Sequence, residues 1–133
     1  MTKKTVGTLF RQTCEKNSDK DAIIYHNKGI QYKKTWKQFY NDCCYFGEML
    51  IKLGLEKQDT VMIQGFNSYQ WFVTHMATIM AGGISAGIYT TNKEDVCKYL
   101  VKDSEAKFVV VENEIHLQKY DLENKNIKYI IPE

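Results

Sequence analysis

The glycines at positions 82, 83 and 87 form a close cluster in the sequence. Glycines spaced in this way can let backbone N–H groups approach a phosphate, as they do where a strand runs into a helix. Here the cluster follows a helical pattern and precedes the apolar run Ile84–Tyr89, and no Lys-Ser or Lys-Thr pair comes after it. This order favours helix termination and close helix–sheet packing over phosphate binding.

The side chains that could act as bases, nucleophiles or metal ligands do not form a recognisable set. His26, His75 and His116 have no Cys, Asp or Glu at the spacing of a closed metal site. Neither Ser68 nor Ser85 lies in a Gly-x-Ser-x-Gly turn. We therefore interpret His75 as a hydrogen-bonded interior histidine and Ser68 as a helix cap.

An acidic pair and an aromatic series can each be interpreted either as functional residues or as structural ones. Asp103 and Glu105 resemble an acid/base pair, but their place near a predicted helix end favours exposure to solvent. An aromatic series at helical spacing could line a groove for an acyl chain, although such a series more often belongs to a core; it comprises Trp36, Phe39, Tyr40 and Phe46. The residues alone thus predict no catalytic, cofactor-binding or metal-binding position.

The amino-acid composition indicates which partners and which cellular compartment to expect. Eighteen basic and sixteen acidic residues leave a net charge of +2, and Arg11 is the single arginine, which argues against a nucleic-acid partner. No Cys-x-x-Cys pair occurs among the four cysteines, so we expect free thiols and a cytoplasmic setting; the cysteines are Cys14, Cys43, Cys44 and Cys97.

A run of 33 residues, Thr60 to Asn92, contains no Asp, Glu, Lys or Arg. A membrane-spanning helix needs about 20 mostly apolar residues, and Gly82 with Gly83 interrupts this run too early. We therefore expect the run to form the buried centre of a parallel sheet, with Ile63 and Ile79 as core residues.

The periodicity predicts two parts within one α/β domain. Residues 1–59 form an entry segment with a helix over 5–17, a hairpin of strands 22–26 and 30–34 joined by a bulged three-residue turn, and a second helix over 35–53 that opens on a capping box. Residues 60–133 form β-α-β layers. Their strands are 61–64, 84–89, 107–111 and 127–131, and their helices are capped at Ser68, at Thr91 or Asn92, and at Asn113, the last running to about residue 122. Strands joined by helical crossovers imply a mainly parallel sheet.

Several segments carry a family resemblance over almost the whole chain, from about Thr5 to Ile131. The runs 65–72 and 81–92, the second of which contains Gly-Ile-Tyr-Thr-Thr-Asn, resemble adenylate-forming long-chain acyl-CoA synthetases of the bubblegum type. Weaker agreement, in the same order, comes from residues 35–40, 103–106 and 109–112. The resemblance implies that residues 1–133 are the N-terminal part of an AMP-binding domain, itself incomplete.

The resemblance also implies a reaction for the parent protein. Such enzymes activate a fatty acid with ATP and magnesium (Mg2+), release pyrophosphate, and transfer the acyl group to coenzyme A. Their phosphate loop and adenylation lysine lie in later segments, so no family catalytic residue can be assigned here. We expect the chain alone to be inert, with the remainder of the domain as partner and with peripheral membrane association and self-association left open. The alternatives are a non-catalytic interaction module and a free-standing nucleotide-binding module.

Overall fold

The structure, a computed structural model, describes residues 4–132. The helices are α1 (Val6–Lys16), α2 (Trp36–Lys52), α3 (Tyr69–Met80), α4 (Glu94–Asp103) and α5 (Glu114–Leu117). The strands are β1 (Asp21–Asn27), β2 (Ile30–Thr35), β3 (Thr60–Gln64), β4 (Ile84–Ile88), β5 (Phe108–Val111) and β6 (Lys128–Ile130). The predicted α/β class is confirmed.

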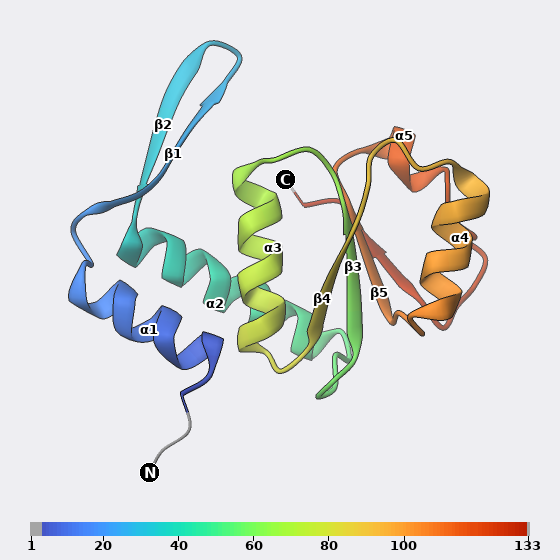
Figure 1. The fold of residues 1–133 in the computed structure, drawn as a ribbon, viewed down its shortest axis with the longest axis horizontal. Helices are drawn as coiled ribbons and strands as arrows, with labels where there is room; N and C mark the ends of the chain where they lie inside the picture. The colour runs from blue at the N-terminus through green and yellow to red at the C-terminus, as the bar shows by residue number, and fades with distance from the viewer. Residues whose placement is uncertain (1–3, 133) are drawn as a thin grey trace.

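The strands form two separate sheets. β1 and β2 make an antiparallel hairpin, and the other four strands make a sheet in the order β4-β3-β5-β6, with all neighbours parallel. Helices α2 and α3 cover one face of this sheet, and α4 and α5 cover the other (Figure 1). The predicted crossovers therefore bring the ends of β3, β4 and β5 to the same edge of the sheet.

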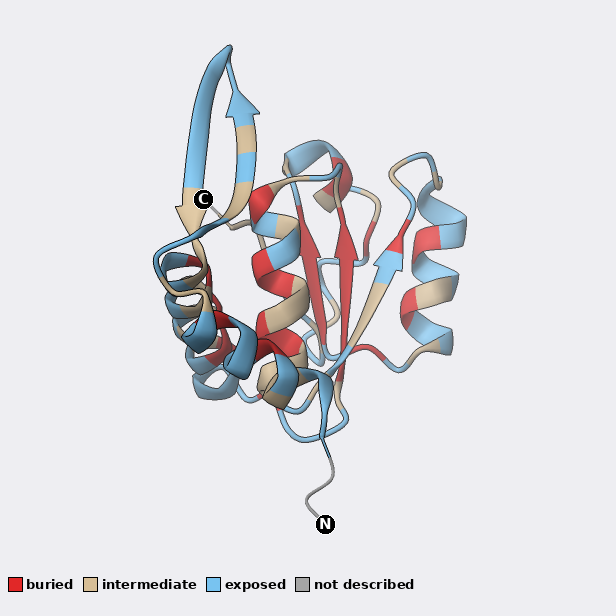
Figure 2. Cartoon of the chain, turned by 60° about the vertical axis from the view of Figure 1, so that its left-hand side comes forward, coloured by how far each residue is buried: buried red, intermediate tan, exposed pale blue. Residues whose placement is uncertain are grey.

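The centre of the sheet is the core that the uncharged run predicts. All five residues of β3 are buried, and β5 is buried throughout, whereas β4 at the edge is half exposed (Figure 2). Ile63 is buried as expected, but Ile79 is only partly buried because it faces the N-terminal helix rather than the sheet. Among residues 4–132, none of the helices combines the length and apolar content that a membrane crossing requires.

The hairpin turn differs from the predicted one. Asn27 pairs with Ile30, so the loop has the two residues Lys28 and Gly29, and the predicted three-residue bulged turn is wrong. Both loop residues have a positive φ, 51° and 79°. A two-residue turn of this kind matches the right-handed twist of the flanking strands, which explains why it replaces the longer loop.

Two predicted helix boundaries are also wrong. α4 begins after Lys93 without a side-chain cap, rather than at Thr91 or Asn92. The amide of Asn92 donates to the carbonyl of Tyr89 in a turn, which delays the helix, and two acidic residues in its first turn favour the new start. α5 ends at Leu117, well before residue 122.

The other caps are confirmed, including the box formed by Thr35 and Gln38 and the cap at Asn113. At the start of α3, Ser68 Oγ accepts a hydrogen bond from the backbone N–H of Trp71 at 3.1 Å. Ser68 is therefore a helix cap.

Replacing Ser68 with alanine is expected to lower the free energy of unfolding by about 0.5–2 kcal/mol, because an N–H of the first turn loses its acceptor. Ser68→Asp, which supplies another acceptor, should recover much of that loss. Denaturant unfolding of the three proteins makes the comparison. An aspartate variant no more stable than the alanine variant would contradict the capping role.

Candidate functional site

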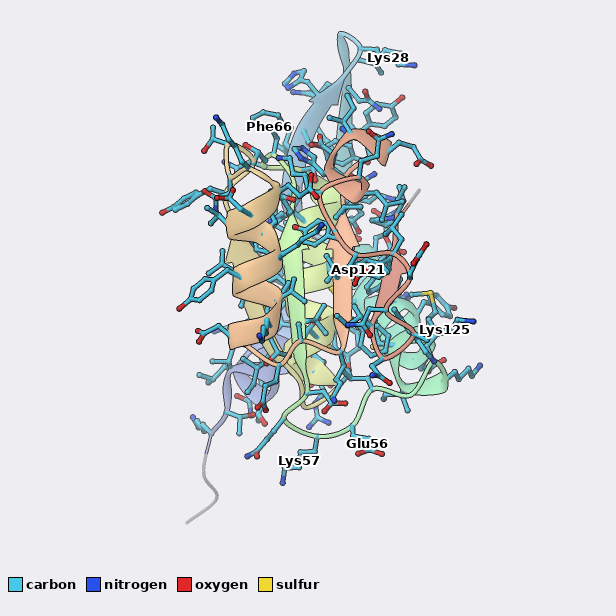
Figure 3. The ribbon with its side chains drawn as sticks, turned by 90° about the vertical axis from the view of Figure 1, so that its right-hand side faces the viewer. Lys28, Glu56, Lys57, Phe66, Asp121 and Lys125 are labelled. Atoms are coloured by element: carbon cyan, nitrogen blue, oxygen red, sulfur yellow. The ribbon has the colours of Figure 1, made fainter. Side chains whose placement is uncertain are left out.

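The candidate site is the edge at which β3, β4 and β5 end. In open parallel sheets, ligands bind in the crevice beyond the carboxyl ends of the strands. Phe66, in the loop after β3, lies toward the end of the molecule where the hairpin tip at Lys28 projects, while Glu56 and Lys57 lie at the opposite end (Figure 3). The site and the hairpin tip therefore share one end of the molecule.

An open groove of about 750 Å³ lies between the loops after β3 and β4. The exposed rings of Phe66 and Tyr89 stand at this groove, with exposed fractions of 66% and 81%. Its remaining lining residues are Gly65, Asn67, Trp71, Gly87, Ile88 and Thr90. A smaller hollow of about 180 Å³ lies beside it, between the sheet and the start of α3. The groove carries no charged side chain, so it suits an apolar or neutral polar group.

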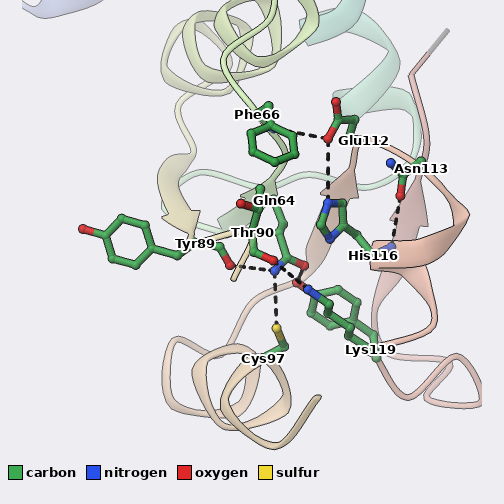
Figure 4. Close-up of polar contacts among 10 residues, drawn as sticks. Gln64, Phe66, Tyr89, Thr90, Cys97, Glu112, Asn113, His116 and Lys119 are labelled. Carbon is green, nitrogen blue, oxygen red and sulfur yellow. Dashed lines mark hydrogen bonds and ion pairs between the residues drawn. The ribbon is translucent and has the colours of Figure 1, made fainter. Parts of the chain in front are cut away.

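The buried side-chain amide of Gln64 connects the segments that form this edge. Gln64, fully buried at the end of β3, donates to the carbonyl of Tyr89 at 2.9 Å and contacts the thiol of Cys97 at 3.5 Å (Figure 4). The hydroxyl of Tyr120 donates to Gln64 Oε1 at 2.6 Å. Burial raises the pKa of Tyr120, which keeps this hydroxyl protonated as a donor. Gln64 thus links β3, the loop after β4, α4 and the segment after α5.

Charged side chains tie the loops to one another around this amide. Glu112 accepts a hydrogen bond from the backbone N–H of Phe66 at 3.3 Å, and its carboxylate lies 3.7 Å from Nε2 of His116. Lys119 donates to the carbonyl of Thr90 at 2.9 Å. A Cβ at Gly65 would lie 3.0 Å from Cβ of Glu112, so a larger residue would force the loop away from β5.

His116 lies deeper than its polar helix suggests. Its side chain is buried, and its Nδ1 is the one buried side-chain polar atom within residues 4–132 that lacks a hydrogen-bond partner. Burial, followed by the charge of Lys119, lowers the pKa of His116, and Glu112 opposes that shift. His116 is therefore neutral at pH 7 and acts here as a packed, uncharged neighbour of the carboxylate.

His75 is hydrogen-bonded, as expected, but it is half buried rather than interior. Its Nδ1 lies 2.8 Å from Oγ of Ser85, and its ring stacks on Trp71 with centroids 5.3 Å apart. Burial lowers the pKa of His75, so the imidazole is neutral near pH 7. A serine–histidine contact resembles a nucleophile and its base, but no further hydrogen bond orients the ring among the described residues.

The structure assigns structural roles to the remaining candidates. Gly82 has a φ of +88°, and a Cβ at Gly83 would lie 3.0 Å from Cγ2 of Thr78 and 3.1 Å from the carbonyl oxygen of Asp59. These glycines therefore end α3 and let the turn after it pass close to the segment that leads into β3. Asp103 and Glu105 are exposed. The aromatic series of α2 packs in the core among α1, α2, α3 and the hairpin, and Phe46 also packs against the parallel sheet. Within residues 4–132, no three His, Cys, Asp or Glu side chains lie together as metal ligands.

The polar residues that organise the edge were not predicted from the sequence; they are Gln64, Glu112, Lys119 and Tyr120. The available signal was the position of Gln64, a lone amide closing the otherwise apolar strand Val61–Gln64. A buried amide at such a point needs partners for each of its donors and acceptors. Those partners lie 25 to 56 residues away, so local patterns could not identify them.

The sheet, its crossovers and the groove at its carboxyl edge define an open, parallel α/β domain. The sequence profile of the AMP-binding enzyme family matches residues 10–131, and the chain belongs to this family. This confirms the resemblance to acyl-CoA synthetases.

Several relatives of this chain are long-chain-fatty-acid–CoA ligases. The Xenopus laevis ligase is 41% identical over 86% of this chain, and a mouse ligase is 38% identical over 89%. The chain spans only 16% and 18% of those two proteins.

Solved structures with this fold are adenylate-forming proteins. Klebsiella oxytoca NpsA in complex with 3-hydroxyanthranilyl-AMSN has a TM-score of 0.82 at 15% identity, with 98% of this chain and 25% of NpsA covered. A fatty acyl-adenylate ligase of L. pneumophila, in complex with acyl adenylate and pyrophosphate, has a TM-score of 0.79 at 19% identity. The match covers 94% of this chain and 22% of that ligase.

Proposed function

We propose that this chain is the N-terminal part of the adenylation domain of a long-chain fatty-acid:CoA ligase. In the first step of that reaction, the fatty acid carboxylate attacks ATP and forms an acyl-adenylate with release of pyrophosphate. In the second, the thiol of coenzyme A displaces AMP and yields acyl-CoA. The observation that carries the proposal is the 41% identity to the Xenopus ligase over most of this chain.

Within such an enzyme, residues 1–133 serve as scaffold and as one wall of the substrate cleft. The division into an entry segment, 1–59, and β-α-β layers, 60–133, is part of the proposal. The groove between the loops after β3 and β4 is uncharged and can face an apolar or neutral part of a ligand. The glycines at 82 and 83 are used in packing, so they do not fit a cradle for the phosphates of ATP. ATP, Mg2+ and coenzyme A are therefore proposed as ligands of the parent enzyme, held by residues outside this chain.

The proposed setting is the cytoplasm, with the parent in peripheral contact with a membrane. All four cysteines are free, which suits a reducing compartment. Burial raises the pKa of Cys14 to about 11 and also raises that of Cys43, so these thiols are structural rather than nucleophilic.

Residues 1–133 alone are expected to show no ATP-dependent ligase activity, because no described residue forms a phosphate loop or an adenylation site. The measurement is pyrophosphate release with palmitate, ATP, Mg2+ and coenzyme A, against a control without protein. Turnover above that control, in a preparation free of contaminating ligase, would overturn the proposal of inertness. Reading the open reading frame past Glu133 tests the ligase itself, which requires a Ser/Thr/Gly-rich loop and a C-terminal lysine to follow.

A second candidate is a non-catalytic interaction module that associates with its own copies. The outer edge of β4 has no partner strand within residues 4–132, and Ile84 on this strand is 50% exposed. An unpaired, partly apolar edge is a template for strand addition. Light scattering of the isolated chain measures this association, and a monomer at all concentrations would contradict it.

A further inference from the structure

The hairpin of β1 and β2 stands away from the rest of the molecule as an arm (Figures 1 and 2). Its inner half is anchored, because the ring of Tyr25 stacks on Tyr69 with centroids 5.3 Å apart. Beyond that contact, every residue from His26 to Lys33 is exposed. Within residues 4–132, no other element covers the outer half of the arm.

The exposed part of the arm carries apolar side chains. Tyr25 pairs with Tyr32 across the hairpin, and Asn27 pairs with Ile30, so Tyr32 and Ile30 extend one face toward the tip. Tyr32 is 41% exposed and Ile30 is 58% exposed; Ile24, on the other face, is 52% exposed. Ile30 and Tyr32 thus give one face of the projecting arm apolar side chains that are available for contact with another surface.

The outer half of the arm carries basic side chains and no acidic one. Between Asp21 and Asp42 the sequence contains no acidic residue, while it contains four lysines, Lys28, Lys33, Lys34 and Lys37. The flanking carboxylates lie at the base, where Asp42 is 3.8 Å from Lys34 and Asp21 is 3.9 Å from Lys33. Lys28 at the tip therefore stands on a part of the arm that has no carboxylate of its own.

We propose that this arm docks on an anionic lipid surface. Ile30, next to the tip, enters the boundary between headgroups and acyl chains, and Tyr32, further along the same face, lies at the headgroup level where aromatic side chains are stabilised. Lys28 at the tip extends its long side chain back to the level of the lipid phosphates, which attract basic residues. The inference rests on the proposed function, because a fatty-acid ligase takes its substrate from lipid. It identifies the hairpin of β1 and β2 as the element that contacts the lipid surface.

Vesicle sedimentation of the 133-residue chain tests this proposal. Binding to vesicles of phosphatidylcholine with phosphatidylserine is expected to exceed binding to phosphatidylcholine alone, and to weaken with salt. Ile30→Ser and Lys28→Glu are each expected to reduce the partition coefficient by about tenfold. The matched controls are Ile84→Ser, a similarly exposed isoleucine on β4, and Lys57→Glu at the opposite end of the molecule; both are expected to bind as the unmodified chain does.

Circular dichroism confirms that each variant keeps its fold before binding is compared. Absence of binding to anionic vesicles, or equal losses in the arm variants and their controls, would overturn the proposal and indicate a protein partner or another surface. The assay contains no ATP or coenzyme A, and ligase activity of the longer protein is measured separately with fatty acid in detergent micelles. A failure of lipid docking is thereby distinguished from a failure of the ligase proposal.

Discussion

Replacing Ile63 with alanine is expected to lower the free energy of unfolding by about 2–5 kcal/mol, because a cavity is left where the surrounding side chains cannot close in. Ile63 is 3% exposed on the central strand β3, and it packs in the cluster that joins the sheet to α2. Urea unfolding of the chain and the variant, followed by circular dichroism, gives the difference.

The matched control is Ile84→Ala on the edge strand β4, where the side chain is 50% exposed. The same atoms are removed, but much of their surface already meets solvent, so the loss is expected to be below about 1 kcal/mol. Equal losses of unfolding free energy at the two positions, or a loss at Ile63 of less than about 1 kcal/mol, would show that β3 is not the centre of the core.

Replacing Gln64 with leucine is expected to lower the free energy of unfolding by about 2 kcal/mol or more. Leucine fits the volume but leaves the hydroxyl of Tyr120 and the carbonyl of Tyr89 without the partners they have at 2.6 and 2.9 Å. Each buried polar group that loses its partner costs about 1–3 kcal/mol. Urea unfolding again provides the measurement.

A double-mutant cycle with Tyr120→Phe separates this network from simple packing. Once leucine stands at 64, removing the hydroxyl of Tyr120 should cost little or even restore stability, because the orphaned donor disappears. The coupling between the two substitutions is expected to be about 0.5–3 kcal/mol. Additive losses would mean that the hydroxyl and the amide do not depend on each other.

Local patterns predicted the elements well, since their causes are local. The capping box at Thr35 and the cap at Ser68 depend on residues three positions apart, and the structure has both. The uncharged run predicted the buried sheet centre because strands covered on both faces exclude charge. The predicted cap at Thr91 or Asn92 is wrong, because these residues lie in or next to a turn and α4 begins only after Lys93.

The polar contacts at the edge where the strands end are determined by the tertiary structure alone. The sequence predicted His116 in a polar helix, yet folding buries it beside Glu112, and its Nδ1 has no hydrogen-bond partner among residues 4–132. Gln64 became the centre of the edge through contacts with Tyr89 and Tyr120, which the crossovers bring to it. Helical and strand periodicity and helix caps depend on residues a few positions apart, so the sequence predicts them. A buried polar network depends on the order of the strands in the sheet, and no local sequence pattern encodes that order.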